Sequence, residues 1–434
     1  MKASADLLLL PQWVLPVESD GALADHAVVV ADGRIVDLLP APDAHARYAC
    51  AETIALPGKV LIPGLVNLHA RAASVLLRGL AVDLPHADAR ARLDAAERAL
   101  LSEAFVRDGT LVAIAEMLAG GITHCCDTYF FPNGSAEAFL EAGMQATIGM
   151  PVRETPTACS SGADDAFARG LALRDTHKDD ARLNFAFHAH ADLSDATLVR
   201  LNTLAEQLGV PVSAAVHENA DAVAAGVRQF GVRPVERLAR LGLLGPSFLA
   251  LHAVHVDAAE IGLLARHGCH VAHSPAAELS AGAGIAPVAG FLHAGVNVGL
   301  GSGAYADGDL FAAMRLAALL AKGVSGDASA MPAAATLRAA TLSGATALGL
   351  EHELGSIAPG KRANLVAVDL SRAADSTFDP VSQLVYVAHR EDVTHVWVDG
   401  RLKLNERCLV DLDVDDITAR ARYWRGKLTG RGSS

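Results

Sequence analysis

Cysteine is scarce in this chain, with six residues among 434. Cys125 and Cys126 are adjacent and the other four are scattered, so the sequence holds neither a disulfide framework nor the Cys-x-x-Cys pairs of a structural zinc site. The expected compartment is a reducing one, the cytoplasm.

Long apolar runs are also absent. No stretch reaches the roughly 18 to 20 apolar residues that cross a bilayer. The run from Leu7 to Leu10 is followed at once by Pro11, without a basic flank or a small-residue cleavage site. We interpret this run as a strand and expect no membrane contact.

The sequence has no excess of basic residues. Lys and Arg number 36 against 49 Asp and Glu, which gives a formal net charge of -13. No basic run is long enough to follow a phosphate backbone, so nucleic acid is excluded as a partner. Because 51% of the residues are hydrophobic, the chain can bury a large core, and a small diffusible substrate is expected.

The two ends of the chain carry the same strand signals. His26 to Val30 and Ile35 to Leu39 flank an Asp-Gly turn, and Thr394 to Val398 precedes a second Asp-Gly turn. A further strand is predicted from Ala363 to Asp369. We therefore expect residues 1–62 and 350–434 to form one small β-sandwich domain.

The middle of the chain, residues 63–349, alternates strands with amphipathic helices. The clearest helices are predicted at Ala104–Ala119, Thr197–Leu208 and Leu310–Lys322. Eight strand-then-helix units predict an α/β fold, a (β/α)8 barrel whose active site lies at the carboxyl ends of its strands. The predicted strands lie near Leu61–His69, Ile122–Asp127, Ala146–Met150, Asn184–His188, Val210–His217, Phe248–His252, Cys269–His273 and Val296–Gly301.

Histidines end several of these strands. One histidine alone is more often a hydrogen-bonded core or rim residue than a functional one. Five at equivalent positions predict a shared site at the barrel mouth, and Glu218 beside the third of them is placed to move protons. The five are His69, His188, His217, His252 and His273.

Several short motifs resemble the amidohydrolase superfamily, and within it the methylthioadenosine/S-adenosylhomocysteine deaminases and the s-triazine hydrolases. The resemblance spans about residues 20 to 425. It implies a barrel with a β-sandwich appendage, homo-oligomers, and one zinc-type metal ion whose bound water displaces a group from a heteroaromatic ring. The motifs are Pro63–His69, Arg78-Gly79-Leu80, His217-Glu218, Ala272–Pro275, Gly284–Val288, Pro359-Gly360-Lys361 and Asp379-Pro380-Val381.

The metal-ligand positions of that family are largely replaced here. The resemblance implies a His-x-His pair, a histidine three residues before Glu218, and an aspartate after strand eight. This chain keeps His69 but has Arg71, Ala215 and Gly303 at the other three positions. A catalytic zinc needs about three protein ligands, so zinc is expected to bind weakly or not at all.

Other family positions match. Glu218 aligns with the proton-shuttling glutamate and His252 with the histidine that positions the attacking water, while His188 and His273 align with pocket histidines. Glu97 aligns with the glutamate that holds ribose hydroxyls, although neighbouring residues of that segment differ. Glu97 is otherwise a solvated carboxylate on a helix face.

The sequence leaves two interpretations of Arg71 open. Its guanidinium either binds an anionic ligand or turns away to pair with Glu218, Asp307 or Asp309.

Three functions remain open. The first is an aminohydrolase that rebuilds a metal site around His69 from His217, His252 and Asp307 or Asp309. The second is a metal-independent hydrolase, and the third is a pseudoenzyme. For the first, residues 215 and 217 would point to the same side of a strand. The second would use Glu218 or a histidine as general base and Arg71 as the stabilising cation. The third would bind a purine- or triazine-like heteroaromatic molecule, or a partner subunit, without turnover.

Overall fold

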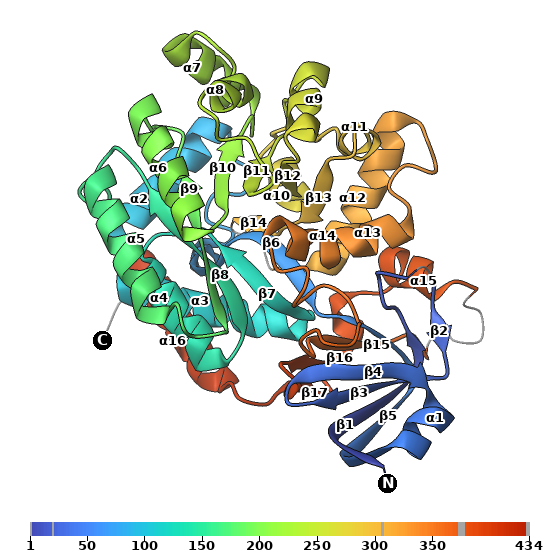
Figure 1. Ribbon diagram of the computed structural model, residues 1–434. Coiled ribbons are helices and arrows are strands. Elements are labelled where there is room, and N and C mark those ends of the chain that lie inside the picture. The colour runs from blue at the N-terminus through green and yellow to red at the C-terminus, as the bar shows by residue number, and fades with distance from the viewer. Residues whose placement is uncertain (1, 20, 305–307, 372–377, 431–434) are drawn as a thin grey trace.

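A parallel sheet curled into a barrel forms the centre of the molecule (Figure 1). The structure is a computed structural model, and it describes residues 2–19, 21–304, 308–371 and 378–430. Its strands are hydrogen-bonded in chain order, and the two-residue strand β14 (Gly303–Ala304) pairs with the first of them and completes the ring. All eight predicted barrel strands are confirmed. They are β6 (Leu65–Arg71), β7 (Ile122–Asp127), β8 (Gln145–Val152), β9 (Leu183–Ala189), β10 (Val212–Val216), β11 (Phe248–His252), β12 (His270–His273) and β13 (Asn297–Leu300).

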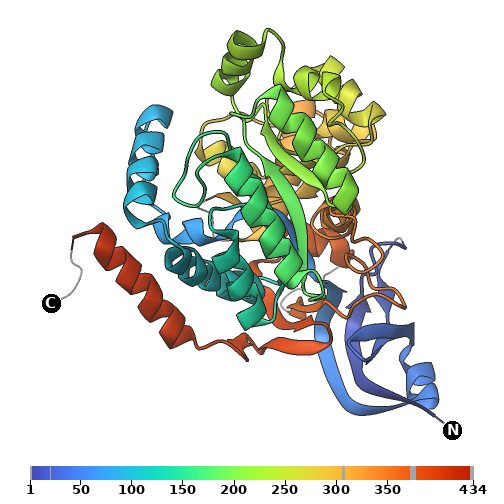
Figure 2. The same ribbon diagram turned by 60° about the vertical axis from the view of Figure 1, so that its left-hand side comes forward.

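Helices cover the outside of this sheet, as Figures 1 and 2 show. Because both faces of the parallel strands are covered, their residues are almost all buried, and β7 is buried throughout. The outer helices are α2 (His86–Leu100), α3 (Glu103–Ala119), α4 (Pro132–Ala142), α5 (Ala163–His177), α6 (Asp195–Leu208), α7 (Ala220–Phe230), α8 (Pro234–Arg240), α9 (Ala258–Arg266), α10 (Pro275–Ser280), α11 (Val288–His293), α12 (Leu310–Ser325), α13 (Ala333–Ala339) and α14 (Leu342–Ala347). Short helical turns lie at Ala72–Leu77 and Arg390–Asp392.

A second, mixed sheet joins the two ends of the chain, as the sequence predicts. Its strands form one continuous sheet with a buried cluster on each face: alternate residues of its first strand point to opposite clusters, Leu7 and Leu9 to one and Leu8 to the other. The strands are β1 (Ala3–Val14), β2 (Leu23–Ala24), β3 (His26–Ala31), β4 (Arg34–Pro40), β5 (Tyr48–Pro63), β15 (Leu365–Asp369), β16 (Val393–Val398), β17 (Arg401–Asn405) and β18 (Cys408–Leu409), with α1 (Ala41–Arg47) between β4 and β5.

The two Asp-Gly turns of this sheet have the expected geometry. Asp32 and Gly33 have φ values of 51° and 72°, and Asp399 and Gly400 have 49° and 71°. Positive φ at both central residues is the signature of a type I′ hairpin turn.

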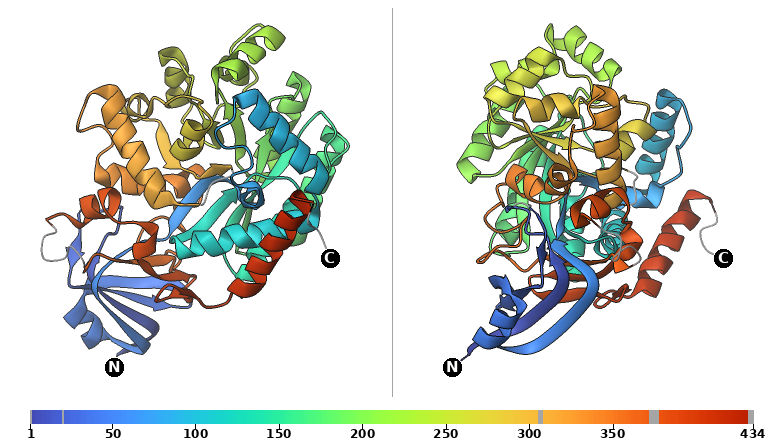
Figure 3. Two further views of the ribbon diagram at one scale, coloured as in Figure 1. Left: turned by 180° about the vertical axis from the view of Figure 1, so that it is seen from behind. Right: turned by 90° about the vertical axis from the view of Figure 1, so that its right-hand side faces the viewer.

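The last helix leaves the small sheet and packs on the barrel. α16 (Val414–Leu428) lies beside α3, as the view from behind shows (Figure 3, left). Trp424 contacts the ring of Phe105 with centroids 5.2 Å apart, and its indole N–H donates to Asp108 at 2.9 Å. Arg420 also donates to Asp108, at 2.8 Å. α15 (Pro380–Tyr386) likewise packs on the barrel helices α12 and α13. The segment after residue 350 therefore contributes strands to the small sheet and helices to the surface of the barrel.

Within the described residues, no helix combines the length and the apolar character needed to cross a membrane.

We predict that Gly301, which follows β13, tolerates no side chain. A Cβ at this position would lie 2.8 to 2.9 Å from the backbone of His69, so Gly301→Ala should lower the free energy of unfolding by about 1–3 kcal/mol. Gly323→Ala in α12 is the matched control, because its Cβ would meet no atom within 4 Å and should stabilise the helix by about 0.5–1 kcal/mol. Urea unfolding of both variants measures the difference, and a Gly301→Ala protein as stable as the parent would contradict the packing.

Candidate functional site

Three of the predicted histidines meet at the barrel mouth. His69 lies near the end of β6 and His252 ends β11, and their rings contact edge to face with centroids 5.2 Å apart. Burial, together with the nearby His252 and His188, holds the pKa of His69 well below its usual range. Burial and the charges around it lower the pKa of His188 to about 3. His69 and His188 are thus neutral at physiological pH.

The tautomer of His69 follows from its neighbour Thr128. The Thr128 hydroxyl donates to the carbonyl oxygen of Ala70 at 3.2 Å, and the same oxygen lies 3.4 Å from His69 Nδ1. Because the hydroxyl proton is used on Ala70, Nδ1 of His69 carries the proton and Nε2 keeps its lone pair.

A buried carboxylate, Glu278 of α10, lies beneath His252 and His273. Its Oε1 accepts from the Ser274 backbone N–H at 2.8 Å and contacts His252 Nδ1 at 3.3 Å, while Oε2 lies 2.8 Å from His273 Nδ1. Burial by itself would raise the pKa of Glu278, but the contacts with His252 and His273 outweigh it and lower the pKa to about 2.

Glu278 was not among the site residues predicted from the sequence. The sequence pattern that could have identified it is a carboxylate one turn into a helix that begins with Pro275, directly after a strand that ends in His273.

Arg71 ends β6 and lies over two aromatic rings. Its guanidinium carbon is 4.7 Å from the ring centroid of Tyr129 and 5.8 Å from that of Phe130, within the range of cation–π attraction. The guanidinium also pairs with Glu97 at 3.5 Å. Among the described residues, the predicted pairing of Arg71 with Glu218 is not formed. Asp309 caps α12, and Asp307 lies outside the described residues.

Glu97 reaches this cluster from α2. Its Oε1 accepts the Tyr129 hydroxyl at 2.6 Å in addition to facing Arg71. The structure thus brings Glu97 to the barrel mouth, where its carboxylate is engaged by two groups of the chain rather than solvated on a helix face.

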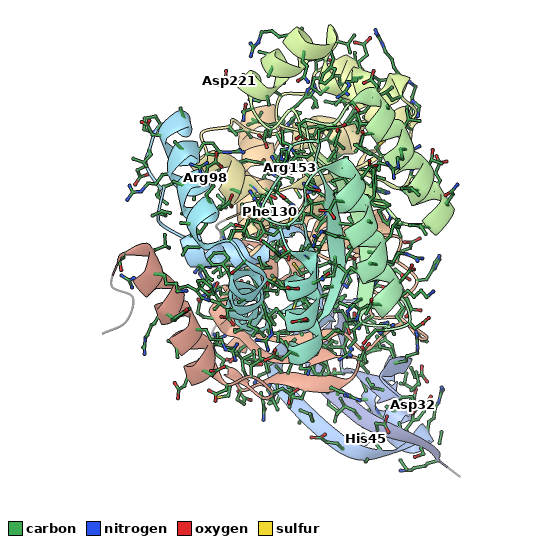
Figure 4. The ribbon with its side chains drawn as sticks, turned by 90° about the vertical axis from the view of Figure 1, so that its left-hand side faces the viewer. Asp32, His45, Arg98, Phe130, Arg153 and Asp221 are labelled. Carbon is green, nitrogen blue, oxygen red and sulfur yellow. The ribbon has the colours of Figure 1, made fainter. Side chains whose placement is uncertain are left out.

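A second guanidinium, that of Arg153, was also missed. Arg153 follows β8 and lies 5.9 Å from the Phe130 ring centroid, and both residues are labelled between α2 and the barrel in Figure 4. Its Nη2 is 3.3 Å from Nδ1 of His190, whose pKa burial and Arg153 lower to about 4. Burial also lowers the pKa of Arg153, and the nearby Arg71 adds to this effect. The mouth therefore holds two guanidiniums around one aromatic ring.

His217 does not join the other histidines. Its Nε2 accepts the Val235 backbone N–H at 3.3 Å, and its Nδ1 lies 3.2 Å from the carbonyl oxygen of His255 and 3.4 Å from Glu260. These partners lie at the start of α8 and around the start of α9, so the His217 ring is directed toward those helices and not toward His69. The expectation that His217 stands above Ala215 was therefore wrong.

The reason is local backbone geometry. β10 ends at Val216, and His217 has a φ of 51°, which breaks the alternation of side chains along the strand. Ala215 itself is exposed, and Glu218 is half-buried. Glu218 has no hydrogen bond or ion pair with the described part of the chain.

The side chains that the structure describes at the mouth form no cluster of metal-binding groups. Among described residues, no group of three His, Cys, Asp or Glu side chains is arranged to hold a metal. A side chain at Gly303 would meet the Ala277 Cβ at 2.5 Å, and the glycine has a φ of 74°. Asp309 caps α12, where its side chain accepts the Ala312 N–H at 3.0 Å.

Comparisons with known proteins agree with this architecture. The model of the amidohydrolase family matches residues 60–403. A 5-methylthioadenosine/S-adenosylhomocysteine deaminase of Saccharophagus degradans is 39% identical, over 100% of this chain and 99% of the relative. One from Teredinibacter turnerae is 38% identical, over 98% of each.

Solved structures give the same result. An adenosine deaminase from Xanthomonas campestris, with bound zinc, superposes with a TM-score of 0.97 at 41% identity and covers 99% of this chain and 100% of that one. An atrazine chlorohydrolase from Arthrobacter aurescens has a TM-score of 0.88 at 20% identity, covering 96% of this chain and 99% of that one, which shows a shared fold alone.

We predict that His188 makes the folded chain acid-sensitive. Its pKa is about 3 when folded and near 6.5 when unfolded, so the unfolded chain binds more protons between these values and stability is lost as the pH falls from about 6.5 toward 3. His188→Gln should flatten the loss measured by urea unfolding between pH 6.5 and 4.5, by up to about 1.4 kcal/mol per pH unit. His352→Gln, with a side chain 92% exposed, is the control and should follow the parent. Parallel curves for His188→Gln and the parent would contradict the assignment.

Proposed function

Because the chain belongs to the amidohydrolase family, we propose that its barrel mouth binds a purine- or triazine-like heteroaromatic molecule without zinc-dependent turnover. The observation that carries this proposal is Arg71, a permanently charged guanidinium that stands where the family has its second metal-binding histidine. The chain remains, by descent, a protein of the C–N hydrolase and deaminase group.

Electrostatics oppose a divalent cation at this place. Two unit charges of like sign 4 Å apart repel by about 4 kcal/mol at an effective dielectric constant near 20, and a divalent cation doubles that cost. A guanidinium cannot be deprotonated to relieve it. His69 alone offers too few donors to offset the repulsion.

The remaining family positions add to this argument. Ala215 has no donor atom, and Gly303 has no space for a side chain because Ala277 fills it. An aspartate or glutamate at position 303 would require α10 to shift. It would also have to adopt the positive φ of Gly303, which a non-glycine residue rarely does.

The chain's own groups suit a flat, polar ligand. The Phe130 ring offers a stacking surface, Arg71 and Arg153 offer N–H donors to ring nitrogens or to an anionic group, and His69 Nε2 offers an acceptor. Glu97 remains the candidate for ligand hydroxyls once Arg71 turns toward a ligand. The relatives named as deaminases of methylthioadenosine and adenosine support purine nucleosides as the first class to test.

Roles for His188, His273, Glu218 and His252 belong to the same proposal, as pocket walls and as remnants of proton-transfer chemistry. So do a cytoplasmic location, homo-oligomers and a division of the chain at residues 62 and 350.

We predict binding without turnover. Adenosine at 100 times its Kd should stabilise the parent by about 2.7 kcal/mol, seen as a rise in Tm, while chromatography detects no inosine even with added zinc. Arg71→Ala should weaken binding about 10- to 150-fold, because a hydrogen bond from a charged group is lost. Arg228→Ala, an exposed arginine of α7, is the control and should bind like the parent. Stoichiometric formation of inosine would refute the proposal.

Metal-independent hydrolysis is a second candidate, favoured by the contact between His252 and the ionised Glu278. A histidine oriented by a carboxylate is a competent general base, and Arg71 would stabilise developing negative charge. General-base catalysis contributes about 10²- to 10⁴-fold, which suffices for an activated ester or lactone but not for an aromatic amine.

This candidate makes its own prediction. Hydrolysis of p-nitrophenyl acetate should survive chelators and fall by about 10²-fold or more in Glu218→Gln or His252→Gln, whichever residue is the base. Glu206→Gln, on the exposed face of α6, serves as the control. If both variants hydrolyse the ester at the parent's rate, this second function is excluded.

A further inference from the structure

Glu278 is a buried ionised carboxylate that the proposed function does not by itself require. Its side chain is 2% exposed, and its Oε1 accepts from the Ser274 N–H and contacts His252 Nδ1. Its Oε2 lies 2.8 Å from His273 Nδ1 but without the geometry of a hydrogen bond. A carboxylate is buried at a cost unless it is paired, and here the neighbours of Glu278 are His252 and His273. The arrangement therefore constrains those histidines.

The hydrogen-bonding capacity of a carboxylate fixes the tautomer of His252. An ionised carboxylate accepts hydrogen bonds and donates none. The contact of 3.3 Å between Glu278 Oε1 and His252 Nδ1 is favourable only when Nδ1 carries the proton. In the neutral ring, Nε2 of His252 then keeps a lone pair.

That nitrogen is not fully buried. Nε2 of His252 forms no hydrogen bond within the described part of the chain, and it is not among the buried polar atoms that lack a partner. The side chain is 15% exposed and stands against His69, whose own Nε2 is also an acceptor. The two rings in edge-to-face contact thus each bring an acceptor nitrogen to the barrel mouth.

We propose that Glu278 is a positioning residue that holds His252 with Nε2 as a hydrogen-bond acceptor, so that the pocket selects ligands with an N–H donor at this point. The second half of this inference rests on the proposed function, because it presumes that a heteroaromatic ligand enters the mouth.

The ligand class follows from this donor requirement. An exocyclic amino group can donate to both His252 and His69, and a ring N–H of a lactam can donate to one of them. A heteroaromatic ring whose edge has neither group leaves the two lone pairs without a partner after the ligand has displaced water. Adenosine and purine riboside form a suitable pair, because they differ only in the 6-amino group.

The first test needs no ligand. In protein labelled with ¹⁵N-histidine at pH 8, where histidine rings are generally neutral, long-range ¹H–¹⁵N spectra should show His252 protonated at Nδ1. The His252→Gln spectrum assigns the signal. Glu278→Gln, whose amide can donate to Nδ1, should shift the population toward Nε2–H. A parent protein with His252 protonated at Nε2 would overturn the inference.

The second test measures selectivity by calorimetry. Purine riboside should bind the parent at least tenfold more weakly than adenosine, a difference of about 1.4 kcal/mol. Glu278→Gln should narrow this gap, and Glu206→Gln should keep it. Equal affinity of the parent for the two nucleosides would overturn the selectivity. If neither nucleoside binds, the proposed function fails for this ligand class, and the ¹⁵N spectra still decide the positioning role.

Discussion

The guanidinium of Arg71 is the charge on which the rest of the barrel mouth depends. It is held by cation–π contacts with Tyr129 and Phe130 and by the carboxylate of Glu97, which comes from α2. A metal ion needs several donor atoms from separate strands, whereas this cation is covalently attached to β6 and needs none. In the proposed function, this fixed cation takes the place of a metal ion at the mouth.

The surrounding groups fit a site with a fixed cation. His69 and His188 are neutral, since burial and nearby positive charge disfavour another proton. Negative charge lies on Glu97, which pairs with Arg71, and on Glu278, which lies against His252 and His273. The pocket therefore has guanidinium donors from Arg71 and Arg153 and imidazole acceptors from His69 and His252, the polarity on which the proposed binding of a heteroaromatic edge rests.

The barrel and the small sheet were predictable from the sequence because they depend on the periodicity of hydrophobic residues and on the residues that form turns. Alternating strands and helices predict the barrel, and the Asp-Gly pairs at residues 32–33 and 399–400 predict the two hairpins that join the chain ends. The histidines at strand ends predict the location of the mouth, and the motifs carry the family resemblance.

Side-chain direction beyond the last strand residue was not predictable. Strand alternation places residues 215 and 217 on one side, but His217 leaves the strand with a positive φ and turns toward α8 and α9. Glu278 and Arg153 lie just past their strands, where a helix start or a loop decides what they face. A sequence pattern of period two carries no information about such positions.

The most direct test of the central claim is the zinc content of the purified protein, measured by elemental mass spectrometry after incubation with excess zinc and exhaustive dialysis. We predict well below one equivalent per chain, because Arg71, Ala215 and Gly303 leave one family ligand, His69. About one equivalent that resists dialysis would contradict this account.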